Sequence, residues 1–200
     1  MEIILAGERR DFLRRSRDFV VVEGGDGLAL GLAFETIVQS RDRVMNQLSE
    51  RYLEDFAVGQ TFGSGRLRID KERILAFAAE FDPQPFHIDE AAADRSIFGG
   101  LAASGWHTAA VTMRLLVESE LEPAGGLIGA GFDECRWPRP VRPGDELRVE
   151  CEVIEVRPSK SRPQQGLIKL RTTTLNQHDK PVMVYVVNLV VPRRSDVRKE

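Results

Sequence analysis

The sequence predicts an α+β domain in which an antiparallel sheet wraps around one long central helix. Two observations support this fold class. Residues 104–121 read as a helix whose first two turns carry no charge, which is typical of a helix end buried on all sides. The segments after it are strand-like, and residues 145–153 alternate apolar and charged side chains, as a sheet with one dry and one wet face requires.

The other elements follow from local patterns. Residues 60–70 resemble a strand. Asp70 is placed to cap a helix over residues 71–81, which has apolar residues at helical spacing. That helix should end near Phe81, because Pro83 and Pro85 each push the preceding residue out of the α region. Residues 166–177 and 180–192 read as two further strands. The second is nearly all apolar, so we expect it to be covered on both faces.

Composition limits the choice of function. With 42% hydrophobic and 30% charged residues in 200, the chain is of the soluble globular class and long enough to bury a core. Its 28 basic and 31 acidic residues are interspersed, so we expect neither nucleic acid nor a membrane as a partner. Its two cysteines lack the spacing of a disulfide framework or a zinc site, which favours a reducing, cytoplasmic location.

Residues 1–44 differ from the rest, with a basic run followed by short apolar pieces. We expect an N-terminal extension of uncertain order at 1–44 and a single domain at 45–200, with Met45 as a possible physiological start.

Two titratable residues flank the proline-rich stretch that follows the first helix. Asp82 and His87 lie five positions apart, and a carboxylate and an imidazole can together hold a water molecule and transfer protons at neutral pH. Asp82 also follows a helix C-terminus, where the macrodipole disfavours a negative charge, and such mismatches cluster at active sites. The alternative is structural: Asp82 caps its own turn, and His87 is a satisfied loop histidine.

The start of the central helix offers hydrogen-bond donors. Ser104 is a natural N-cap, and the unpaired amides of the first turn begin at Gly105. Backbone amides in that position can stabilise a developing oxyanion, although simple capping explains the same residues.

The order of elements, with "DPQPFH" before the central helix and "ASG" at its start, resembles the MaoC-like, R-specific enoyl-CoA hydratase branch of the hot-dog fold. The likeness covers roughly residues 50–192. It implies hydration of a trans-2-enoyl-CoA to an (R)-3-hydroxyacyl-CoA, with Asp82 and His87 as the catalytic pair and the Gly105 amide on the thioester oxygen. No metal or other cofactor is implied. The sequence departs from the usual family motif in two places, with Gln84 in place of Asn and Ser104 in place of His.

Three further expectations concern contacts with the substrate and the oligomeric state. Arg157, Lys160 and Arg162 form a basic turn that either meets the phosphates of CoA or is a solvated hairpin tip. His107 either lines the pocket or is a core histidine bonded to a backbone carbonyl. Unpaired sheet edges, together with the family resemblance, predict a homodimer or larger homo-oligomer.

Two other functions remain open: a thioesterase of the same fold and a non-catalytic acyl-CoA-binding module. The presence of both Asp82 and His87 argues against each.

Overall fold

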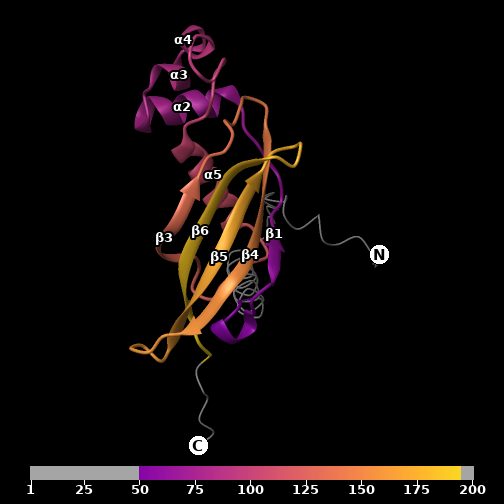
Figure 1. Ribbon diagram of the computed structural model, residues 1–200, viewed down its shortest axis with the longest axis vertical. Helices are drawn as coiled ribbons and strands as arrows, with labels where there is room; N and C mark the ends of the chain where they lie inside the picture. The colour runs from indigo at the N-terminus through magenta and orange to yellow at the C-terminus, as the bar shows by residue number, and fades with distance from the viewer. Residues whose placement is uncertain (1–49, 195–200) are drawn as a thin grey trace, which may run out of the picture. The chain divides into compact units, whose positions relative to one another are not determined.

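The computed structural model describes residues 50–194 (Figure 1), so the expectations for residues 1–44 lie outside it. The sheet is antiparallel. Its strands lie side by side in the order β1 (Thr61–Gly63), β4 (Glu146–Pro158), β5 (Gln165–Leu175), β6 (Pro181–Pro192) and β3 (Ile128–Arg136). A short strand, β2 (Leu67–Arg68), also pairs with β4, and a 3-10 turn, η2, spans Leu53–Asp55.

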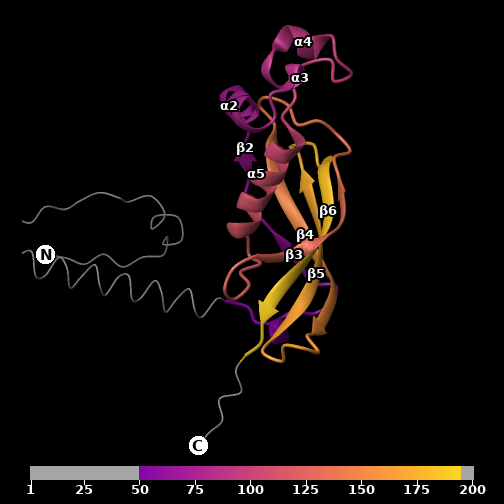
Figure 2. The ribbon, with the colours of Figure 1, turned by 90° about the vertical axis from the view of Figure 1, so that its left-hand side faces the viewer.

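Helix α5 (Gly105–Val117) lies along one face of the sheet (Figure 2). The other helices gather at the end of the sheet nearest to the α5 N-terminus, and they are α2 (Lys71–Phe81), α3 (Pro85–Ile88) and α4 (Glu90–Asp94). This arrangement brings the proline-rich stretch next to the start of α5. The predicted α+β architecture, a sheet wrapped against one central helix, is confirmed.

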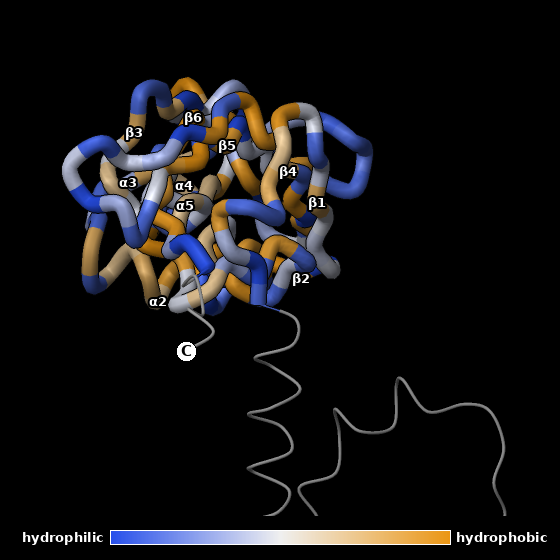
Figure 3. Tube along the Cα trace, turned by 90° about the horizontal axis from the view of Figure 1, so that it is seen from below, coloured by the Kyte–Doolittle hydropathy of each residue, from blue (hydrophilic) through white to orange (hydrophobic). Residues whose placement is uncertain are grey.

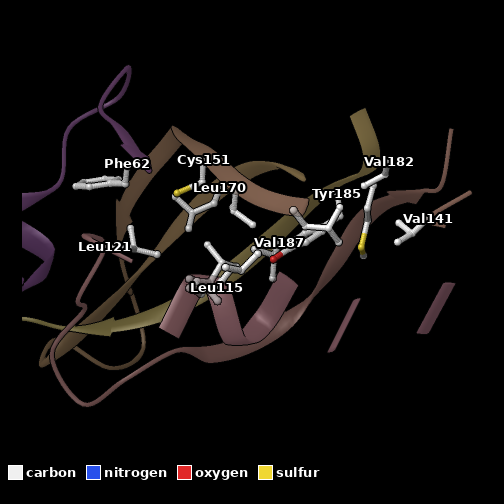
Figure 4. Close-up of a cluster of buried hydrophobic side chains, with 14 of the residues drawn as sticks. Phe62, Leu115, Leu121, Val141, Cys151, Leu170, Val182, Tyr185 and Val187 are labelled. Atoms are coloured by element: carbon white, nitrogen blue, oxygen red, sulfur yellow. The ribbon is translucent and has the colours of Figure 1, made fainter. Parts of the chain in front are cut away.

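The core fills the space between α5 and the sheet. Leu115 of α5 packs there with Leu170 of β5 and Val187 of β6 (Figure 4). The alternation predicted for β4 is confirmed, because Leu147, Val149, Cys151 and Val153 are all buried and the charged residues between them are not. Seen from below in Figure 3, the sheet carries both hydrophobic (orange) and hydrophilic (blue) stretches. Every residue of β6 is buried or half-buried, as its apolar sequence indicates.

A pair of threonines joins the helix to the sheet. The Thr112 and Thr174 Oγ1 atoms lie 2.7 Å apart, and Thr112 Oγ1 also donates to the Thr108 carbonyl at 2.8 Å. Both hydroxyls are fully buried, so leaving either unpaired would cost about 1–3 kcal/mol.

Several details differ from expectation. The strand predicted at 60–70 is two short strands with a break between them. The proline-rich stretch is not a simple loop: Pro83 ends α2, but Pro85 occupies the first turn of α3, where a missing amide costs nothing. Asp89 then caps α4 by accepting a hydrogen bond from the Ala92 amide at 2.8 Å. No pattern singled out β3, whose sequence contains Gly129 and Gly131 and whose pairing with β6 is irregular.

The expectation that the start of α5 is buried on all sides is wrong. The core-facing side is buried, but Trp106 in the first turn is 66% exposed, and further along the helix Met113 is 43% and Val117 65% exposed. An apolar face of the central helix is therefore left open.

Candidate active site

Asp82 is the C-cap residue of α2, and its carboxylate faces the start of α5. Oδ2 accepts a hydrogen bond from the Ser104 hydroxyl at 2.6 Å, and Oδ1 accepts one from the Gln84 amide at 2.7 Å. The Ser104 hydrogen bond, then the Gln84 hydrogen bond and the nearby His87, hold the pKa of Asp82 below its ordinary value despite partial burial. The sequence argument considered only the unfavourable dipole of α2 and missed the donors at the start of α5.

His87 lies in α3 and its side chain is only 6% exposed. Its Nδ1 is 2.7 Å from the Ala102 carbonyl oxygen. A carbonyl only accepts hydrogen bonds, so Nδ1 carries the proton and Nε2 of the neutral ring has a free lone pair. Nε2 lies 3.5 Å from Asp82 Oδ2. The structure thus brings the two predicted residues together.

Two hydrogen-bond acceptors facing each other at this distance have a clear chemical use. A water molecule can donate one hydrogen to Asp82 Oδ2 and the other to His87 Nε2, which leaves its lone pairs directed at a substrate. If the imidazole takes a proton from that water, its new N–H faces the carboxylate and the pair becomes a stabilised ion pair. The alternative in which Asp82 only caps its own turn does not fit these contacts, because its carboxylate accepts from another element.

Ser104 and Gly105 begin α5 as predicted. Ser104 Oγ accepts a hydrogen bond from the Trp106 amide at 3.1 Å while it donates to Asp82, so one hydroxyl both caps the helix and orients the carboxylate. Within residues 50–194, the Gly105 amide has no hydrogen-bond acceptor. It is therefore free to bind a ligand oxygen.

The glycine at 105 has a second cause that the sequence did not reveal. Trp137 packs against it, and a Cβ atom at Gly105 would lie 3.1 Å from Trp137 Cε2. The Trp137 indole also donates to the Gly105 carbonyl at 2.9 Å. A side chain here would have to displace the indole.

Arg142 holds the loop that carries the Ala102 carbonyl. Its guanidinium donates to the carbonyls of Gly100 at 2.5 Å and Leu101 at 3.1 Å, and also to that of Phe98. The Ala103 amide donates to the Val141 carbonyl at 2.9 Å, which fastens the same loop a second time. Sequence reasoning missed Arg142, because nothing in the local pattern shows that its partners lie some 40 residues away.

His107 is not the satisfied core histidine that the sequence favoured. Its Nδ1 is buried without a hydrogen-bond partner, and its ring lines a groove between α2 and α5. The groove has a volume of about 420 Å³. His178 lies in an exposed turn.

The basic turn lies between β4 and β5, at the end of the sheet opposite α2 and α3 (Figure 1). The structure therefore does not bring Arg157, Lys160 and Arg162 near the Asp82–His87 pair of the same subunit. Arg157 pairs with Glu155 at 3.2 Å.

Two candidate features are absent from the described part of the chain. No group of three or more histidine, cysteine, aspartate or glutamate side chains between residues 50 and 194 is arranged to hold a metal ion. No helix in the same range is long and apolar enough to cross a membrane.

A family model described as the MaoC like domain matches residues 55–175. The chain belongs to the MaoC-like dehydratase family. Protein YdeM of Bacillus subtilis, itself uncharacterised, is 31% identical over 141 residues, which is 70% of this chain and 99% of that protein. Mesaconyl-CoA hydratase of Cereibacter sphaeroides is 41% identical over 65 residues, but these are only 32% of this chain and 19% of that enzyme.

Solved structures agree with the family assignment. The MaoC-like dehydratase from Rhodospirillum rubrum is 56% identical, with a TM-score of 0.70 over 72% of this chain and 99% of that one. The R-hydratase PhaJ1 from Pseudomonas aeruginosa is 27% identical, with a TM-score of 0.57 over 72% and 86% of the two chains. The fold is the hot-dog fold of the MaoC-like proteins.

The two residues that depart from the usual MaoC-like motif both contact Asp82. Gln84 donates a hydrogen bond to its carboxylate through the side-chain amide, and Ser104 donates one through its hydroxyl.

Proposed function

We propose that this protein catalyses the reversible hydration of a trans-2-enoyl-CoA to an (R)-3-hydroxyacyl-CoA. The observation that carries the proposal is the pair of acceptors, Asp82 Oδ2 and His87 Nε2, 3.5 Å apart beside the free Gly105 amide. The family and the likeness to proteins described as R-hydratases support it, and the R configuration rests on them alone.

In the hydration direction, the Gly105 amide donates to the thioester oxygen and draws electron density from C3. The water held between Asp82 and His87 attacks C3, its O–H bond breaks, and His87 Nε2 takes the proton. Negative charge develops on the thioester oxygen, where the α5 N-terminus stabilises it. The His87 imidazolium then returns a proton to C2, and the thioester carbonyl re-forms.

His87 is the better proton acceptor of the two. Its Nε2 lone pair is free, whereas the lowered pKa of Asp82 makes that carboxylate a weak base. Asp82 instead orients the water and stabilises the imidazolium. Because one group takes and returns the proton on one side of the substrate, both new bonds form on the same face of the double bond.

This stereochemistry gives a test of the mechanism. Hydration of crotonyl-CoA in D₂O should give (R)-3-hydroxybutyryl-CoA with deuterium at C2, added to the same face as the hydroxyl. Product analysis by NMR after conversion to a chiral derivative would show this. Anti addition, or the S product, would contradict the one-face mechanism, and release of free CoA would indicate a thioesterase.

We also propose that the protein forms a homodimer through β3 and the open face of α5. All nine residues of β3 are exposed, and among the described strands β3 pairs only with β6, so its other edge is free. Phe132 of β3 is 60% exposed, and Trp106 and Val117 on α5 are similarly open. A second copy related by a two-fold axis would pair the edge and cover the apolar face.

Replacing Phe132 by aspartate places a charge on this surface and should convert the dimer to monomer in analytical ultracentrifugation. Aspartate in place of Val58, which is 66% exposed outside β3 and α5, is the matched control and should leave the dimer intact. A Phe132→Asp protein that stays dimeric would place the interface elsewhere.

A further inference from the structure

The groove between α2 and α5 is connected to the proposed catalytic residues through its lining residues Phe81 and His107. It is lined by Arg73, Phe77 and Phe81 on α2 and by His107, Val111 and Arg114 on α5. Phe81 directly precedes Asp82, and His107 follows Gly105 by two residues. The groove wall therefore begins one residue from Asp82 and two residues from Gly105.

His107 is held rigidly in the groove wall. It is 7% exposed, and its ring stacks on Phe77 with centroids 4.8 Å apart and planes 8° from parallel. Burial and then the charge of Arg73 lower the pKa of His107, which keeps the ring neutral at physiological pH. Its Nδ1 is enclosed and has no hydrogen-bond partner. Among the described residues, Nε2 has none either.

These facts decide which nitrogen carries the proton. An enclosed N–H without an acceptor is more costly than an enclosed lone pair, so the proton of the neutral ring belongs on Nε2. Because Nδ1 is enclosed, Nε2 is also the only ring nitrogen that a ligand in the groove can reach. His107 thus presents one hydrogen-bond donor and no free acceptor.

His107 lies in the first turn of α5, two residues after Gly105. Its ring stacks on Phe77 of α2, and the charges that act on it are those of Arg73 and Asp70. The opposite charges along the groove nearly balance, since Arg73 pairs with Asp70 at 3.5 Å, Arg114 pairs with Glu118 at 3.1 Å, and Glu80 also lines the groove. Recognition there depends on the hydrogen bond more than on net charge.

We infer that the groove receives the acyl chain beyond the double bond and that His107 Nε2 donates a hydrogen bond to an oxygen atom of that chain. The substrate class is then an enoyl-CoA whose acyl chain bears a carbonyl or carboxylate oxygen, in preference to a plain alkyl chain. This inference rests on the proposed hydratase function and names the substrate of the same site.

Matched substrate pairs test it. The four-carbon pair is crotonyl-CoA and fumaryl-CoA. The six-carbon set is trans-2-hexenoyl-CoA, the CoA monothioester of trans-2-hexenedioic acid, and the methyl ester of that monothioester. We expect kcat/KM to be at least about tenfold higher for the oxygenated member of one set. With an alkyl substrate, no oxygen accepts from His107 Nε2, and a buried donor stays unpaired. A preference for the acid over its ester identifies a carboxylate, and equal rates identify a carbonyl.

Two variants of His107 separate the hydrogen bond from packing. His107→Phe keeps a flat ring against Phe77 without the N–H, and it should abolish the preference, so that kcat/KM falls at least about tenfold more for the oxygenated substrate than for the alkyl one. His107→Gln places an amide N–H near the Nε2 position and should retain part of the preference. If His107→Phe lowers kcat/KM by the same factor for every substrate, the inference is overturned. The ring would then contact the CoA portion that all substrates share, or contribute to packing alone.

The two proposals fail in different ways. If the wild-type protein hydrates alkyl enoyl-CoAs with the same kcat/KM as their oxygenated counterparts, this inference is overturned and the proposed hydratase function stands. Protein that hydrates none of the five thioesters would overturn both.

Discussion

Ser104 joins two functions in one hydroxyl, and substituting it separates them. It caps α5 and donates a 2.6 Å hydrogen bond to Asp82 Oδ2, a length typical of a hydroxyl bonded to an ionised carboxylate. Such a charge-assisted bond is worth about 1.5–3 kcal/mol. If Asp82 acts as proposed, loss of the bond that orients its carboxylate should raise the barrier by a similar amount, which corresponds to a fall of about 10- to 150-fold in kcat/KM.

The matched variants are Ser104→Ala and Ser104→Gly. Both remove the donor, but alanine at an N-cap costs about 0.5–2 kcal/mol of stability whereas glycine costs only a few tenths. We therefore expect equal losses of kcat/KM in enoyl-CoA hydration. Chemical denaturation should show that the alanine variant is less stable than the glycine variant by about 1 kcal/mol.

The pH profile supplies an independent readout. Ser104 is the largest cause of the lowered pKa of Asp82, so both variants should raise that pKa and move the step that Asp82 contributes to the acid limb of kcat/KM to higher pH. The stability that the ionised carboxylate contributes is present above its unfolded pKa and is lost as pH falls through the folded pKa, so in the variants this contribution should be smaller and its loss should be complete at higher pH. If the glycine variant keeps wild-type activity and the wild-type acid limb, Ser104 is only a cap and the reasoning is refuted.

Three other substitutions test parts of the site. Arg142→Met should release the loop that carries the Ala102 carbonyl. We expect kcat to fall by about tenfold or more and the melting temperature to fall by several degrees. The same substitution at the exposed Arg139 should change neither quantity. Gly105→Ala should lower kcat/KM and alter Trp137 fluorescence, because its Cβ displaces the indole; unchanged fluorescence would show that the site absorbs the methyl group. If the basic turn binds CoA phosphates, replacing Arg157, Lys160 and Arg162 together by alanine should raise KM for CoA thioesters and not for pantetheine thioesters. If KM for CoA thioesters is the same in the variant and the wild type, the turn is a solvated hairpin tip.

Local patterns predicted most of the fold correctly. Asp70 does cap α2, Phe81 does end it, and the alternation in β4 does separate a buried from a wet face. These features depend on residues within a few positions of each other, which is the range over which capping, proline and periodicity act. The irregular strand β3 has no such signal, because its glycines and its bulged pairing with β6 break the alternation.

The site was predictable in its members and not in its contacts. The motif singled out Asp82, His87 and Gly105, and the structure brings the first two within 3.5 Å. The hydrogen bond from Ser104 to Asp82 joins residues 22 positions apart and reverses the expected effect of the α2 dipole. Neither that contact nor the anchoring by Arg142 follows from local spacing, since both depend on how α5 packs against the end of α2.

The central claim is that one water, held between Asp82 and His87, adds to an enoyl thioester. The most direct measurement is the loss of the conjugated enoyl-thioester absorbance with crotonyl-CoA and longer enoyl-CoAs. It should compare the wild type with Asp82→Asn, His87→Ala and the exposed-turn control His178→Ala. The account predicts turnover in the wild type and in His178→Ala, and a loss of about a hundredfold or more in each of the other two. Turnover that survives both substitutions, or a wild type that hydrates no enoyl-CoA, would contradict it.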